Sequence, residues 1–141
     1  MKTRLSISKS TLVITLLLTA LVTHALGQLP RACIDIKPWS DPNAINLKSR
    51  GVIPVAIKTW GFLDATQVDP STVTFGPDEA TPVHGGHIED VDGDGDLDMV
   101  LHFNVQDTGI QPGDTQAYIY GSTLGGLDFY GYDSIVTVPP H

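Results

Sequence analysis

The segment Leu97-Asp98-Met99-Val100-Leu101-His102-Phe103 places a large apolar side chain at every second position. A period of two puts these side chains on one face of an extended chain, so the segment predicts a β-strand that covers a hydrophobic core. Similar short apolar and β-branched runs recur along the chain between Gly, Pro, Asp and Asn residues, which is typical of a β-sandwich or barrel. The candidate strands are residues 33–37, 51–59, 72–75, 98–103, 116–120, 127–130 and 135–138. We therefore expect an all-β protein with a single β-sandwich-like domain.

Pro54 interrupts the second of these candidate strands. Proline lacks the N–H that a sheet ladder needs, so we expect this strand at the edge of a sheet or at a bulge. Residues 63–68 are the best candidate for a helical turn, which the following Asp69-Pro70 pair would end.

Residues 1–27 have the pattern of a secretory signal peptide, with a basic start, an apolar stretch and small residues at the end. The apolar stretch, residues 11–22, is shorter than the roughly 20 residues needed to span a bilayer. The preferred cleavage site follows Ala25-Leu26-Gly27. We therefore expect residues 28–141 to form the mature domain, secreted and without insertion in a membrane.

The charge of the chain is strongly acidic. The 141 residues include 8 basic and 16 acidic ones, and the predicted signal peptide removes three basic residues and no acidic one, so the mature chain has a formal charge of −11. Such a surface repels phosphate backbones and excludes nucleic-acid binding as the main role, whereas it attracts cations. The single Cys33 cannot form an internal disulfide, so it is a buried thiol, half of an intermolecular bridge or the remainder of a lost pair. A bound metal ion is then the obvious alternative source of stability.

The strongest motif is a run of aspartates at every second position: Asp90, Asp92, Asp94, Asp96 and Asp98. These carboxylates repel one another, and no basic residue lies nearby in the sequence to offset them. Ca²⁺ resolves the conflict because it takes six to eight oxygen ligands in a flexible shell. We expect side-chain oxygens from the first three aspartates, the backbone carbonyl of Asp96 and a closing carboxylate from Asp98, directly or through water.

The loop also contains the residues that such a curled conformation needs. Gly95 allows a left-handed backbone, and Leu97 is expected to point inward and anchor the loop to the core. The run resembles the D-x-D-x-D-G calcium loops of EF-hands, dockerins, thrombospondin repeats and integrin-type propellers. It departs from the EF-hand because Leu101 stands where a bidentate Glu is required and a strand follows instead of a helix. The resemblance therefore implies the strand-flanked form of this calcium loop, and the alternative is a solvated acidic turn.

Three segments together resemble a recurrent bacterial exported module. They are Ile34-Asp35-Ile36-Lys37-Pro38, Gly51-Val52-Ile53-Pro54-Val55-Ala56-Ile57 and Asp90-Val91-Asp92-Gly93-Asp94-Gly95-Asp96-Leu97-Asp98. The module occurs in secreted and cell-surface proteins without an established catalytic activity. The resemblance thus implies a non-catalytic role, which we expect to be structural or adhesive. A polysaccharide or a cell-surface protein is the expected partner. Trp39 departs from the module, which has glycine at this position, so the first turn is expected to differ.

Histidines provide a weaker metal-site hypothesis. His84, His87 and His102 could form a zinc site, which takes three or four N, O or S ligands. The sequence favours surface histidines instead, because glycines separate the first two and loosen the loop. It also places His102 on the strand face opposite to Leu101 and Phe103. No nucleophile motif or separated acid pair is present, so we expect no enzymatic activity.

Aromatic residues suggest an alternative function, a carbohydrate-binding module with exposed Tyr and Trp side chains. Tyr118 and Tyr120 share one face of a candidate strand, and Tyr130 and Tyr132 could share a face of its hairpin partner. With Trp39 or Trp60 these rings could form a flat surface that stacks against a polysaccharide. The simpler interpretation is that cross-strand aromatic pairs stabilise the sheet.

Overall fold

The computed structural model describes residues 28–139 of the chain. The predicted signal peptide, residues 1–27, lies outside the described residues, as do residues 140–141. None of the helices in the described range is both long and apolar enough to cross a membrane.

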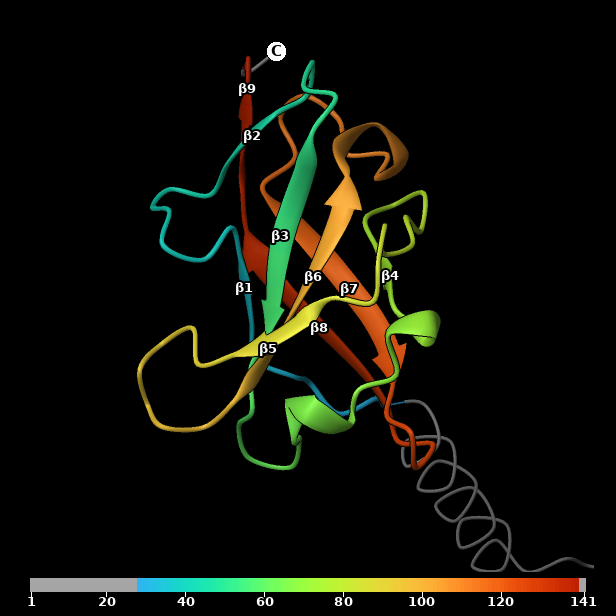
Figure 1. The fold of residues 1–141 in the computed structure, drawn as a ribbon. Helices are drawn as coiled ribbons and strands as arrows, with labels where there is room; N and C mark the ends of the chain where they lie inside the picture. Colours follow the sequence, from blue (N-terminus) through green and yellow to red (C-terminus); the bar gives the residue numbers. More distant parts are fainter. Residues whose placement is uncertain (1–27, 140–141) are drawn as a thin grey trace, which may run out of the picture.

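The described residues form an all-β structure, which confirms the predicted class (Figure 1). A four-stranded sheet has the order β1-β3-β6-β5, a three-stranded sheet has the order β4-β7-β8, and β2 pairs with β9. The pairs in the two larger sheets are antiparallel, whereas β2 and β9 run parallel. The strands are β1 (Ile34–Ile36), β2 (Ala44–Asn46), β3 (Val52–Ile57), β4 (Thr74–Phe75), β5 (His87–Glu89), β6 (Asp98–Asn104), β7 (Gln116–Ser122), β8 (Asp128–Ser134) and β9 (Val136–Val138).

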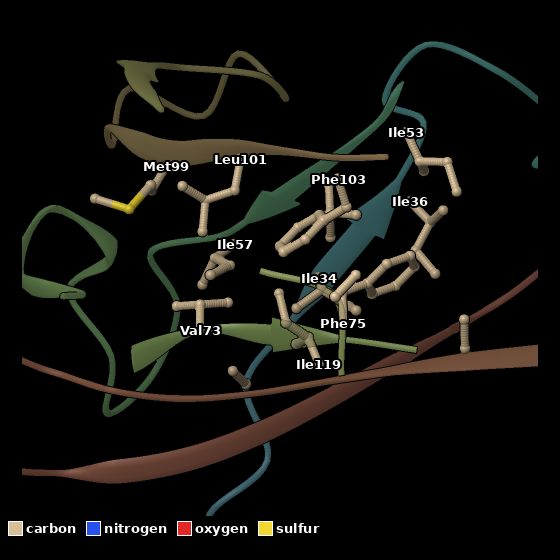
Figure 2. Close-up of a cluster of buried hydrophobic side chains, with 14 of the residues drawn as sticks. Ile34, Ile36, Ile53, Ile57, Val73, Phe75, Met99, Leu101, Phe103 and Ile119 are labelled. Carbon is tan, nitrogen blue, oxygen red and sulfur yellow. The ribbon is translucent and has the colours of Figure 1, made fainter. Parts of the chain in front are cut away.

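The two larger sheets enclose one hydrophobic core. β6 contributes the buried Met99, Leu101 and Phe103, as their alternation predicted, and the opposite sheet contributes Phe75 and Ile119 (Figure 2). The ring centroids of Phe75 and Phe103 lie 5.1 Å apart, so aromatic contact joins the two sheets at the centre. The arrangement is a β-sandwich, because each sheet buries one face against the other.

Seven predicted strands are present with shifted ends, and two short ones were missed. β2 and β5 have three residues each, too few to show a period of two. Their partners, β9 and β6, lie far away in the sequence or across the acidic run. The expected helical turn is confirmed as the 3₁₀-helix η1 (Ala65–Gln67), and the Asp64 side chain caps it by accepting the Thr66 N–H.

Pro54 lies in a central strand, so its predicted place at an edge or a bulge is wrong. β3 has β1 on one side and β6 on the other, and Pro54 pairs with His102 in a regular register. The Pro54 carbonyl accepts a hydrogen bond from the Lys37 N–H at 2.8 Å, so the polar groups of Pro54 face the β1 side. β1 ends at Ile36, so the N–H that proline lacks would have pointed just past the last residue of β1. It would not have pointed at β6, so no hydrogen bond between β3 and β6 is lost.

The turn after β1 has a left-handed backbone at Trp39, a conformation that usually requires glycine. Trp39 has φ of 70°, in the left-handed region that favours glycine, and its side chain is 74% exposed. The ring therefore gains little packing that could offset the strain of this conformation.

Candidate metal centre

The acidic run forms the connection between β5 and β6. These strands pair antiparallel and end with Glu89 opposite Asp98, so residues 90–97 leave the sheet as a loop beyond its last rung (Figure 1). Gly93 and Gly95 have φ of 74° and 95°, and a Cβ at either position would meet no atom within 4 Å. The left-handed backbone predicted for Gly95 is confirmed, and it lets the loop curl back over its own aspartates.

Asp98 is the fixed point of this site. It is the first residue of β6 and is fully buried, with 0% of its surface exposed. Its Oδ1 accepts the Thr59 N–H at 2.9 Å and its Oδ2 accepts the Val91 N–H at 3.0 Å. The carboxylate thus connects the end of the neighbouring strand to the start of the loop, and each oxygen keeps a further lone pair.

Asp90 organises the interior of the loop. Its Oδ1 accepts the Gly93 N–H at 2.8 Å and the Asp94 N–H at 3.2 Å, and its Oδ2 accepts the Gly95 N–H at 3.0 Å. Asp92 adds a weaker bond from the Asp94 N–H to its Oδ1 at 3.3 Å. These bonds close a turn that gathers carboxylates although they repel one another.

Three of the five predicted ligands come together. Asp90, Asp92 and Asp98 each offer a carboxylate oxygen, and these atoms lie within 4.8 Å of one another. The group could hold a metal ion, because one cation can contact all three oxygens. Asp94 and Asp96 lie outside this group, and the Asp94 Oδ1 accepts the Asp96 N–H at 2.9 Å instead.

Lys58 is a basic neighbour that the sequence did not predict. Its Nζ lies 3.5 Å from Asp92 Oδ2. The last pair of the β3–β6 ladder is Ile57 and Met99, so the residue after β3, Lys58, lies opposite Asp98 at the end of the loop. Desolvation raises the pKa of Asp92, but the Asp94 N–H and the Lys58 ammonium outweigh it, so this pKa is lowered overall. The Asp96 N–H lowers the pKa of Asp94, but desolvation and the charges of Asp92 and Asp96 outweigh this effect and raise it.

Leu97 does not anchor the loop, contrary to its prediction. Its side chain is 51% exposed, whereas the side chain of the next residue, Asp98, is the one buried beneath the loop. Thr59 makes the anchor instead: its Oγ1 donates to the Leu97 carbonyl at 2.5 Å and accepts the Ala65 N–H at 2.8 Å. The end of the loop is therefore attached to η1 by hydrogen bonds rather than by apolar packing.

The candidate histidines are closer together than the sequence indicated. The ring centroid of His102 lies 4.9 Å from that of His84 and 5.7 Å from that of His87. As predicted, His102 faces away from the core, since Leu101 and Phe103 are fully buried on the other side of the strand.

The tyrosines form a ladder across one face of the three-stranded sheet. In the β7–β8 register Tyr118 pairs with Tyr132 and Tyr120 with Tyr130, and their ring centroids lie 5.3 and 6.4 Å apart. Arg31 caps one end, with its Cζ 3.8 Å from the centroid of the Tyr132 ring.

Two further residues lie apart from this ladder. Trp60 lines a hollow with Lys58, Asp92 and Asp94, beside the acidic loop. Cys33 is exposed, so it is not a buried thiol.

Comparison with known proteins gave no relative: no family model, no curated protein and no solved structure matches the chain significantly.

Proposed function

We propose that this chain is a secreted, non-catalytic calcium-binding module with a structural or adhesive role. Ca²⁺ orders the loop from Asp90 to Asp98 and attaches it to the sheet. The observation that carries this proposal is the burial of the Asp98 carboxylate beside Asp90 and Asp92. A buried carboxylate with two neutral N–H donors is costly unless a positive charge compensates it.

The chemistry of the donors favours calcium over other divalent ions. The three converging side chains offer only hard carboxylate oxygen atoms. Zn²⁺ prefers nitrogen and sulfur, and Mg²⁺ requires a rigid octahedron that a glycine-rich loop does not impose. The resemblance to the exported bacterial module supports the same function, and the partner we propose for it is a polysaccharide or a cell-surface protein.

Calcium binding would stabilise the native state because the unfolded chain has no assembled site. Extracellular modules bind Ca²⁺ with Kd of about 10⁻⁴ to 10⁻³ M. At about 10 mM Ca²⁺ such a site adds roughly 1.4 to 2.7 kcal/mol to the free energy of unfolding. The module would therefore be filled and rigid outside the cell and empty at cytosolic calcium levels.

The test is a thermal melt of the purified protein in EDTA and then in millimolar calcium. The midpoint should rise in calcium, and the rise should be lost in Asp92→Asn, which removes one of the three converging carboxylates. Asp107→Asn is a matched control, because this exposed aspartate only accepts a side-chain hydrogen bond from Asn104 outside the loop. An equal midpoint with and without calcium would identify the loop as a solvated acidic turn.

Carbohydrate binding is the second candidate, and the tyrosine ladder favours it. Tyr118 and Tyr120 are 39% and 48% exposed, so the ladder presents ring surface to solvent. A hollow of about 430 Å³ lined by Gln28, Leu29, Tyr120 and Tyr130 adjoins it and provides hydrogen-bonding groups beside the rings. Retention on insoluble polysaccharides tests this function. It should be weakened in Tyr120→Ala and unchanged in Trp60→Ala, which removes an exposed ring outside the ladder.

A further inference from the structure

Three histidines from two paired stretches of chain gather on the outer face of the four-stranded sheet. His102 lies in the middle of β6, His87 begins β5, and His84 lies in the segment before β5. The ring of His102 contacts both others, with centroid distances of 4.9 Å to His84 and 5.7 Å to His87. His84 and His87 are exposed, whereas His102 is half-buried.

The segment that carries His84 is fixed on the sheet, although two glycines follow it. The Val83 N–H donates to the His102 carbonyl at 2.9 Å, which ties this segment to β6. Gly86 has φ of 76°, and a Cβ there would lie 2.6 Å from both the Val100 carbonyl oxygen and Leu101 Cδ2. Gly86 therefore allows a close approach of two backbones and brings His84 to His102 instead of loosening the loop.

The nitrogen atoms of the three rings are poorly satisfied by the protein. His102 Nδ1 is buried and has no hydrogen-bond partner, which is costly for a polar atom. His84 Nδ1 accepts only a long bond from the Gly86 N–H at 3.4 Å. His87 Nε2 lies 3.1 Å from Glu89 Oε1, so its proton is directed at the carboxylate and its Nδ1 keeps a free lone pair.

We propose that His84, His87 and His102 form a second metal site, separate from the acidic loop, that binds a borderline divalent transition-metal ion such as Zn²⁺. Imidazole nitrogen is the preferred ligand of these ions, whereas Ca²⁺ prefers oxygen. A carboxylate that holds the second nitrogen of a ligating histidine is a common feature of zinc sites, and Glu89 occupies that position at His87.

Binding requires a rotation of the two exposed rings. Nitrogen ligands at 2.0–2.1 Å around a tetrahedral Zn²⁺ lie about 3.3 Å apart, so the stacked rings must turn their nitrogens toward one point. His84 and His87 are exposed, and the Glu89 side chain that contacts His87 is partly exposed too, so these rings have room to turn while His102 stays in place. A water molecule can complete the shell.

The test is a titration of the purified protein with Zn²⁺ by calorimetry in millimolar calcium, so that the acidic loop is already occupied. We expect one equivalent to bind, and Co²⁺ to give the visible absorption of a tetrahedral site with nitrogen ligands. His102→Gln and His84→Gln should each weaken binding at least tenfold, and Glu89→Gln about 10- to 100-fold. His141→Gln is the control for removal of a histidine elsewhere in the chain and should bind as the wild type.

Two further measurements separate this site from the acidic loop and from misfolding. Asp92→Asn should lose the calcium response and keep zinc binding, so that failure of either site is seen independently. In the wild type, Zn²⁺ should shift the imidazole resonances of all three histidines in NMR spectra, a readout that needs no variant. Absence of binding, binding that survives both His102→Gln and His84→Gln, or binding lost in Asp92→Asn would overturn the proposal.

Discussion

Replacement of Asp98 by asparagine separates the two roles that the structure gives this carboxylate. The side chain is fully buried, and its two oxygens accept the Thr59 and Val91 N–H groups at 2.9 and 3.0 Å. Asparagine has the same shape but only one oxygen. Its NH₂ group must face one of the two N–H donors, so one backbone N–H loses its acceptor inside the protein.

The expected cost follows from this geometry. A buried donor that loses its acceptor costs about 1–3 kcal/mol, which lowers the midpoint of a domain of this size by roughly 4–15 °C even without calcium. Asp98→Asn also removes one of three converging ligands, so the calcium increment of roughly 1.4–2.7 kcal/mol should be largely lost. In calcium the variant should therefore fall below the wild type by about 2–6 kcal/mol.

The assay is urea and thermal unfolding followed by circular dichroism, in EDTA and in about 10 mM CaCl₂. Asp92→Asn is the matched control, because this exposed residue shares the ligand group but has only one long backbone bond and a solvent-accessible ion pair with Lys58, which contributes little to stability. It should match the wild type in EDTA and lose only the calcium increment. If Asp98→Asn were as stable as the wild type in EDTA, or kept the full calcium increment, the role assigned to this buried carboxylate would be refuted.

Three other substitutions test separate parts of the structure. Lys58→Gln removes the cation 3.5 Å from Asp92 Oδ2 that competes with calcium, so calorimetry at low salt should show about a 2- to 5-fold gain in calcium affinity; unchanged affinity would contradict this. Because burial lowers the pKa of folded His102 below its unfolded value near 6.5, the folded state binds fewer protons and stability should fall as the pH drops below about 6.5. His102→Gln should flatten that slope in urea titrations without zinc, and an unchanged slope would exclude His102 as its source. Trp39→Gly relieves a left-handed backbone at an exposed ring and should raise stability in urea unfolding by about 1 kcal/mol, whereas a loss of stability would mean that the ring packs usefully.

Much of the fold was predictable because alternation is a local signal. The pattern around Met99, Leu101 and Phe103 identified the strand and its buried face. Pairing is not local. The place of Pro54 in a central strand depends on where β1 ends, which is set by the turn that begins at Lys37. The parallel pair of β2 and β9 joins three-residue segments that have no period of their own.

The candidate site was also predictable only in part. The spacing of the aspartates identified the loop, because the charge conflict is visible in the sequence alone. Which carboxylates converge was not visible, since the hydrogen bonds of Asp90 direct the loop inward and leave Asp94 and Asp96 outside the group. Lys58 lies 34 positions from Asp92 in the sequence and reaches it only through the register of β3 on β6.

The alternation of β6 explains why both candidate metal sites lie on the same side of the sheet. Each residue that faces the core is followed by one that faces outward, so the strand that buries Met99 and Leu101 also directs Asp98 and His102 to the opposite face. The loop between β5 and β6 covers Asp98, and the segment before β5 covers His102. The Asp98 carboxylate has only neutral N–H donors, from Thr59 and Val91, and His102 Nδ1 has no hydrogen-bond partner at all, so neither group is fully compensated. A hard cation at one end of the strand and a borderline cation four residues away would satisfy both with the ligand type that each prefers.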